Sequence, residues 1–227
     1  MNLENNNGNI EIIKDAEGKS LVLVNDIRFK GRREIAWKEV EEYLKEYVGN
    51  CYEILETSKK IYIGGDFPGE FAHSEDAKSL KGANAKAKAN AAQAIKELIQ
   101  IATNERCSED FHKKHGNKAK YGWYRYDTRF ALPVYNDAGG LERYNIFTAR
   151  ILIRHDQDGR LYLYDILRTK KKQAHRLGNS RTVAKLASTQ ILSKRYSNVN
   201  KNIEVIAKNQ LQNQSHFPQS YAIIELI

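Results

Sequence analysis

The residues best suited to chemistry lie in Tyr121–Phe130, YGWYRYDTRF, which holds five aromatic rings, two arginines and one aspartate. Read as a strand, this stretch alternates its side chains between two faces, so Arg125 and Arg129 share one face while Tyr124 and Tyr126 share the other. Guanidinium groups bind phosphate, and aromatic rings stack on bases. The pattern therefore predicts a nucleic-acid site on this strand, with a strand that is merely well anchored as the alternative.

The spacing of the other reactive residues indicates neither a metal site nor a cofactor site. Cys51 and Cys107 are too far apart for a metal or redox motif. His112 and His115 lack partners at the spacing of a zinc site, and no glycine pair leads into the Gly-Lys-Ser/Thr of a phosphate loop. We therefore expect no metal and no cofactor, and chemistry done by His, Lys and Arg side chains.

Cleavage of RNA without a metal is one reaction that such side chains perform. The ribose 2′-hydroxyl attacks the adjacent phosphorus, which requires a general base, a general acid and cations around the phosphate. The candidates for catalysis are Lys88, His115, Arg125 and Arg129, and the candidates for RNA binding are Tyr124, Tyr126, Arg150 and His155.

Each candidate also has a purely structural interpretation. Lys88 falls on the apolar face of a helix, from whose edge a long side chain can still reach solvent. The arginines could instead form cross-strand pairs with Asp127, Glu142 or Asp165. His155 directly precedes a turn, where an exposed side chain without a function is common.

The periodicity of apolar residues predicts helices followed by strands. Helical spacing begins at about Glu34 and, more strongly, covers 84–103, where Ala, Lys, Glu and Leu predominate. Strand-like segments at 121–134, 141–155 and 160–167 are joined by turn-rich links, which favours an antiparallel meander. The order of these elements predicts an α+β fold with helices packed on one face of a small antiparallel sheet.

The net charge of +9 lies at one end of the chain. Arg168–Ile227 holds 11 of the 37 Lys and Arg residues and 2 of the 28 Asp and Glu residues, so the remainder is neutral. Binding of a polyanion by the ordered part must therefore come from a local arrangement of charge and not from general basicity.

These patterns divide the chain into three parts. We expect partly frayed N-terminal strands or a hairpin (1–28), a central domain (29–172), and a basic, Asn- and Gln-rich tail (173–227) that is partly helical or disordered. No apolar run approaches the length of a membrane span, so we expect a cytoplasmic protein with no membrane partner.

Three segments carry a resemblance to a known family. LKGANAKAKANAAQAI, KHGNKAKYGWYRYDTRFALPVY and YNIFTARILIRHDQDGRLYLYDI resemble a domain of large polyvalent proteins of phages and conjugative elements. The resemblance covers about 29–172 and implies the barnase, EndoU, colicin and RelE-like nuclease fold with metal-independent ribonuclease activity. Matched residue by residue, it points to Lys88, His115, Arg125 and Arg129 as catalytic. Members often read YNVFHA where this chain has Thr148 in place of the histidine.

Together, the residues and the resemblance predict an RNA endonuclease that leaves a 2′,3′-cyclic phosphate. Its expected substrate is tRNA or another single-stranded RNA, and an effector or toxin of this kind is expected to have a cognate immunity protein. It would act in the cytoplasm, either of its own cell or of a recipient cell into which a phage or mobile element delivers it. The alternative is an accessory module that binds nucleic acid or a partner protein without cutting, which Thr148 favours, and a third possibility is an inert fragment of a larger polyprotein.

Overall fold

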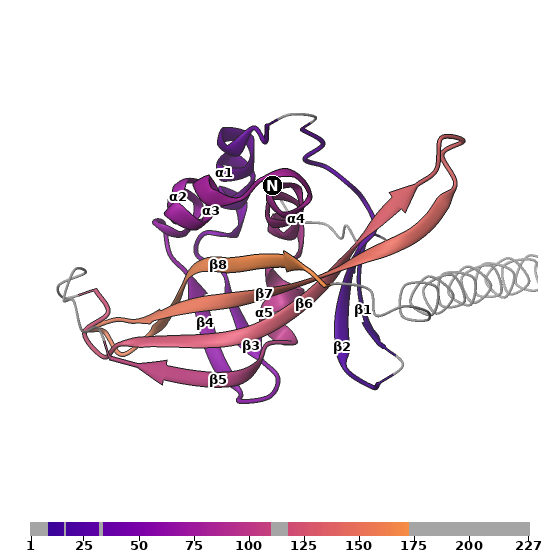
Figure 1. The fold of residues 1–227 in the computed structure, drawn as a ribbon. Coiled ribbons are helices and arrows are strands. Elements are labelled where there is room, and N and C mark those ends of the chain that lie inside the picture. Colours follow the sequence, from indigo (N-terminus) through magenta and orange to yellow (C-terminus); the bar gives the residue numbers. More distant parts are fainter. Residues whose placement is uncertain (1–8, 16, 32–33, 110–117, 173–227) are drawn as a thin grey trace, which may run out of the picture. The chain divides into compact units, whose positions relative to one another are not determined.

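The computed structural model describes residues 9–15, 17–31, 34–109 and 118–172, which all belong to one compact unit, Met1–Ala184 (Figure 1). The strands in this part are β1 (Ile10–Lys14), β2 (Ser20–Val24), β3 (Cys51–Ile54), β4 (Lys59–Ile63), β5 (Thr103–Ser108), β6 (Trp123–Tyr135), β7 (Leu141–His155) and β8 (Leu161–Lys171). The helices are α1 (Trp37–Leu44), α2 (Phe67–His73), α3 (Glu75–Ser79), α4 (Gly82–Ala91) and α5 (Ile95–Gln100), with 3₁₀ turns η1 (Lys45–Tyr47) and η2 (Ala92–Ala94).

All the described strands form one mixed sheet in the order β1-β2-β6-β7-β8-β4-β3, and β5 pairs with β6 beside that path. The predicted meander is confirmed, because β6, β7 and β8 pair antiparallel in sequence. Two hairpins, β1–β2 and β3–β4, join the meander through parallel pairing of β2 with β6 and of β4 with β8.

The predicted fold class is wrong in the size, pairing and shape of the sheet. Helix α5 contacts β1 and β3, which lie at opposite ends of the strand order, and also β6 near its middle. The sheet therefore curls into a half-barrel around short helices instead of lying as a small antiparallel sheet beneath them. The flanking hairpins cause most of the difference, since they extend the meander to seven strands through parallel pairs. β5 adds the eighth described strand by antiparallel pairing with β6.

The helix predicted over 84–103 is two short helices, α4 and α5, separated by the turn η2. The break lies at Ala94, whose backbone leaves the helical region at φ −123° and ψ 27°. The apolar face predicted for the helix over 84–103 is confirmed, because its residues are all buried: Ala87, Ala91, Ala94, Ile95, Leu98 and Ala102. Alanine at these positions allows α4 and α5 to pack closely within the curled sheet.

Alternation along β6 separates the core from the outer face of the sheet. Tyr126, Thr128 and Phe130 are buried, and Phe130 stacks on Phe147 of β7 with ring centroids 5.5 Å apart. The intervening residues, Arg125, Asp127 and Arg129, point to the opposite face and are partly exposed. The period of two expected for this stretch is therefore confirmed, and all the charge of the central part of β6 lies on the outer face.

Lys88 of α4 is fully buried on the core side. Its ammonium lies 2.9 Å from Asp165 of β8 and 3.2 Å from Asp76 of α3, and it also lies over the Phe71 ring at 5.0 Å. Burial raises the pKa of Asp165, and the adjacent Lys88 charge opposes this effect. This ion pair joins α4 to β8, the last strand of the meander.

We expect Lys88→Met to lower the free energy of unfolding by about 3–5 kcal/mol, because Asp165 is then buried without its counter-charge. Urea unfolding followed by circular dichroism measures this change. Lys88→Met combined with Asp165→Leu should regain most of the loss, since packed apolar groups then replace the pair. Lys78→Met, which removes an exposed lysine paired with Glu75, is the matched control. If Lys88→Met unfolds at the same urea concentration as wild type, a structural role for Lys88 is contradicted.

Candidate functional site

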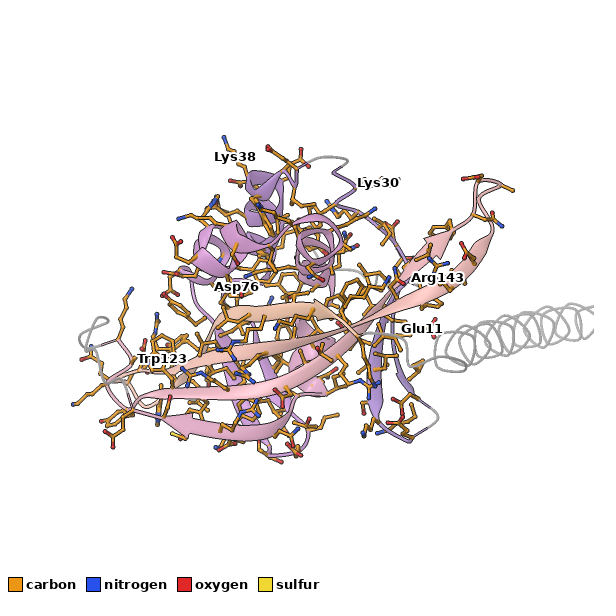
Figure 2. The ribbon with its side chains drawn as sticks, in the orientation of Figure 1. Glu11, Lys30, Lys38, Asp76, Trp123 and Arg143 are labelled. Carbon is orange, nitrogen blue, oxygen red and sulfur yellow. The ribbon has the colours of Figure 1, made fainter. Side chains whose placement is uncertain are left out.

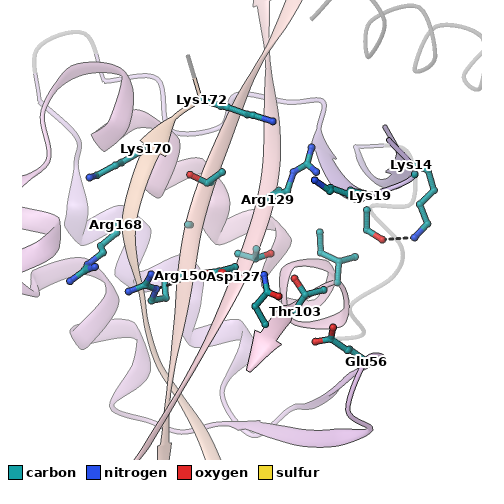
Figure 3. A pocket seen from close by; sticks show the side chains of 17 residues that line it. Lys14, Lys19, Glu56, Thr103, Asp127, Arg129, Arg150, Arg168, Lys170 and Lys172 are labelled. Carbon is teal, nitrogen blue, oxygen red and sulfur yellow. Dashed lines mark hydrogen bonds and ion pairs between the residues drawn. The ribbon is translucent and has the colours of Figure 1, made fainter. Parts of the chain in front are cut away.

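A basic groove of about 830 Å³ opens on the outer face of β6, β7 and β8 (Figure 3). Within the described part of the chain, seven basic and two acidic side chains line it: Lys14, Lys19, Arg129, Arg150, Arg168, Lys170, Lys172, Glu56 and Asp127. This excess of positive charge contrasts with the neutral composition of the chain before Arg168. We call this surface the basic groove.

The basic groove begins where β6 exchanges one edge partner for another. β5 pairs with β6 as far as Asp127, and β2 begins to pair at Phe130. The β1–β2 turn and the start of β5 therefore leave a gap beside the middle of β6. From this gap the groove crosses β7 at Thr148–Arg150 and reaches the end of β8.

Arg129 is held at one wall of the basic groove by Asp15, at 2.5 Å. Burial acts to raise the pKa of Asp15, but hydrogen bonds from Arg129 and from the backbone N–H of Lys19 hold it below its usual range. The Nε of Arg129 is buried and has no hydrogen-bond partner among the described residues. Asp15 therefore fixes the β1–β2 turn to β6 and leaves one arginine donor unused.

Asp127 is the carboxylate at the centre of the basic groove, and several donors share it. It accepts hydrogen bonds from Arg106 at 2.5 Å and from Asn104 at 3.3 Å, while Arg150 Nε lies 3.7 Å away, beyond hydrogen-bond distance. Burial acts to raise the pKa of Asp127, but these hydrogen bonds and the charges of Arg106 and Arg150 lower it. One carboxylate thus neutralises Arg106 and leaves Arg150 poorly paired.

Arg125 and Arg168 face the same surface without a carboxylate partner among the described residues. Arg125 donates to the neutral hydroxyl of Ser108. Its pKa is lowered by burial and then by the charges of Arg150, Arg168 and Arg106. Mutual repulsion of this kind is relieved when an anion binds between the guanidinium groups.

The structure brings together some of the residues singled out from the sequence and separates others. Arg125, Arg129 and Arg150 share the outer face. Lys88 is fully buried and neutralised by two carboxylates, so its ammonium is not available to a phosphate held by these arginines. His115 lies outside the described residues.

The aromatic residues expected to bind RNA do not line the basic groove. Tyr126 is fully buried and donates to Glu105 at 2.6 Å, so its ring cannot stack on a base. Tyr124 is partly buried, with the Lys59 ammonium 4.4 Å from its ring centroid. His155 lies between the rings of Tyr121 and Tyr124 at centroid distances of 4.9 and 5.8 Å.

Five cations of the basic groove were not identified from the sequence: Lys14, Lys19, Arg168, Lys170 and Lys172. The charge count groups the last three with the basic end of the chain, Arg168–Ile227, although β8 continues to Lys171 and pairs Lys170 with Thr148. The signal that could have identified them is the uninterrupted run from Leu161 into Lys170, which continues the strand.

The Arg129–Asp15 pair predicts how stability depends on pH. Because the pKa of Asp15 is lowered in the folded state, its contribution is present above the unfolded value of about 3.9 and is lost as pH falls through the folded value. We expect Asp15→Asn to lose about 1–3 kcal/mol at neutral pH. The difference in free energy of unfolding between Asp15→Asn and wild type should become smaller as the pH falls below about 4. Urea unfolding midpoints of both proteins at several pH values measure this. A difference that does not change with pH would contradict the assignment.

Three further findings bear on function. In the part of the chain that the structure describes, no helix is long and apolar enough to cross a membrane. Over the same residues, no three His, Cys, Asp or Glu side chains gather in a way that could hold a metal ion. Comparison with protein-family models, curated proteins and solved structures finds no match to this chain.

Proposed function

We propose that the chain binds single-stranded RNA along the basic groove. The observation that carries the proposal is the concentration of seven basic and two acidic lining side chains on one face of the described sheet. A positively charged channel that follows the phosphate backbone is the common element of proteins that bind single strands. The sequence after Lys172 holds further Lys and Arg residues and few acidic ones.

Other groups on the outer face suit an RNA strand. Thr148 is exposed at the centre of the basic groove, where its hydroxyl can exchange hydrogen bonds with a ribose 2′-hydroxyl. Towards the start of β8, the ring centroid of Tyr162 lies 5.9 Å from that of Tyr62 on β4. The Cζ of the exposed Arg160 lies 5.1 Å from the Tyr62 ring centroid. These rings are partly exposed and offer stacking surfaces for bases.

The described residues support binding more directly than cleavage. Arg125 and Arg129 can neutralise phosphate charge, but Lys88 lies on the core side and His115 is outside the described residues. Thr148 also stands where the family that the sequence resembles often has histidine, and a threonine hydroxyl does not act as a general base near neutral pH. A binding module is therefore the better-supported of the two functions expected from the sequence.

We expect Lys170→Ala with Lys172→Ala to weaken binding of a labelled single-stranded RNA. Because each lost phosphate contact reduces the dependence of log K on log salt concentration by about 0.7, the slope should become shallower by about 1.4. Fluorescence anisotropy across a salt series measures both effects. Lys38→Ala with Lys78→Ala is the matched control, since both lysines are exposed on helices, and Figure 2 shows Lys38 on the helix layer.

Equal affinities and slopes for the two double variants would contradict binding in the basic groove. The same RNA, incubated with the full chain in EDTA and analysed on a gel, distinguishes binding from catalysis. We expect it to remain intact. Fragments ending in a 2′,3′-cyclic phosphate would instead support the ribonuclease that the sequence resemblance implies.

Asp127→Asn should strengthen RNA binding. Asp127 is the carboxylate among the arginines of the basic groove, and removing one negative charge near phosphate changes the free energy by about 1 kcal/mol, or roughly fivefold in affinity. Glu39→Gln, on the exposed face of α1, changes the net charge equally and is the control. If both variants gain affinity alike, net charge and not the groove determines binding.

A further inference from the structure

Three arginines from adjacent strands meet at one point of the outer face. Arg125 of β6 lies opposite Leu152 of β7, and Arg150 lies two residues along β7, so the two arginines are diagonal neighbours. Such neighbours are about 7–8 Å apart at Cα, within reach of long side chains. Arg150 in turn pairs with Leu167 of β8, the residue before Arg168. Figure 3 shows Arg150 and Arg168 projecting from neighbouring strands.

Arg168 is held in this place by an irregularity of β8. Between Thr148 and Arg150 the register with β8 shifts, so that the span from Leu167 to Lys170 contains an extra residue. Arg168 has a φ of +54°, a left-handed conformation that is unfavourable for a residue with a side chain. Its backbone N–H donates to Asp76 Oδ1 at 2.9 Å, which anchors the bulge to α3.

Asp76 therefore has two contacts, one through each carboxylate oxygen. Its other oxygen accepts from the buried Lys88 at 3.2 Å, so the ion-pair network of the core also fixes the backbone of Arg168. Bulges with a strained residue recur next to functional sites, where they direct a side chain towards a ligand. Here the side chain directed onto the outer face is Arg168.

The charge at this point is not balanced within the protein. Asp127 is one of the two carboxylates that line the basic groove in the described part of the chain; it lies 3.7 Å from Arg150 and is already bound by Arg106 and Asn104. Arg150 Nε is buried and without a hydrogen-bond partner in the described part of the chain. Unused donors and like charges gathered at one place favour a ligand with more than one negative charge.

We propose that Arg125, Arg150 and Arg168 form a subsite for a phosphomonoester, the terminal phosphate of the RNA strand that the basic groove binds. A phosphodiester within a strand carries one negative charge. A terminal phosphate carries about −1.5 to −2 charges and three acceptor oxygens, which suits three guanidinium groups. This inference rests on the proposed function and adds to it a recognised end of the strand.

The test compares one single-stranded RNA sequence in three forms: with a 5′-phosphate, with a 3′-phosphate and with hydroxyls at both ends. Fluorescence anisotropy with an internal label gives the affinity of the full chain for each form. We expect one phosphorylated form to bind about tenfold tighter than the hydroxyl form, since added charge-assisted hydrogen bonds have about this effect. Inorganic phosphate at constant ionic strength should remove the preference, because it occupies the same subsite.

Arg168→Gly is the decisive variant. Glycine adopts a positive φ without strain, so the bulge is retained while the guanidinium is lost. We expect this variant to unfold at an unchanged or higher urea concentration and to bind all three RNA forms equally. Lys170→Ala, in the basic groove but outside the subsite, should weaken binding of the three forms by the same factor and leave their ratio unchanged.

Two results would overturn the subsite and are distinguishable from failure of the proposed function. If wild type binds the three forms equally and Lys170→Ala weakens binding, the basic groove binds RNA without a terminal-phosphate subsite. If Arg168→Gly retains the preference, the subsite lies elsewhere. If no RNA binds, the proposed function fails. The anion site can still be tested by unfolding wild type and Arg168→Gly with and without inorganic phosphate at constant ionic strength. Stabilisation of wild type but not of Arg168→Gly would support the site, and no stabilisation of wild type would exclude it.

Discussion

The alternation of side chains along β6 is the constraint on which the rest of the structure depends. Because successive residues point to opposite faces, Tyr126, Thr128 and Phe130 enter the core while Arg125, Asp127 and Arg129 cannot. A curled sheet filled by α4 and α5 has room for apolar residues on its inner face. Every charged residue of the central part of β6 is therefore left on the outer face, where β7 and β8 add further cations.

This constraint also explains why Lys88 does not belong to the same site as the arginines. A lysine on the apolar face of α4 must enter the core, and it is tolerated there because Asp165 and Asp76 neutralise it. Asp76 links Lys88 to Arg168 nonetheless, since one carboxylate oxygen binds the Lys88 ammonium and the other accepts from the backbone N–H of Arg168. The lysine contributes to the basic groove through the position of a backbone segment and not through its own charge.

The parts of this fold that the sequence predicts are those that depend on local periodicity. The meander and the buried face of α4 and α5 follow from periods of two and 3.6 residues. The parallel pairs depend on contacts between residues far apart in the chain, such as Val22 with Phe130, and no local pattern indicates them. β5 was missed because its sequence, TNERCS, is polar throughout and almost fully exposed, so it lacks an apolar alternation.

The candidate site was predicted in part for the same reason. Arg125, Arg129 and Arg150 follow from strand alternation, whereas Arg168 reaches the groove through a bulge whose positive φ is stabilised from α3. Strain at Arg168, repulsion around Arg125 and the unused Nε of Arg150 each disfavour the folded state, yet all three occur at one place. Their coincidence on an open face is explained if a bound anion relieves the repulsion and satisfies the donors.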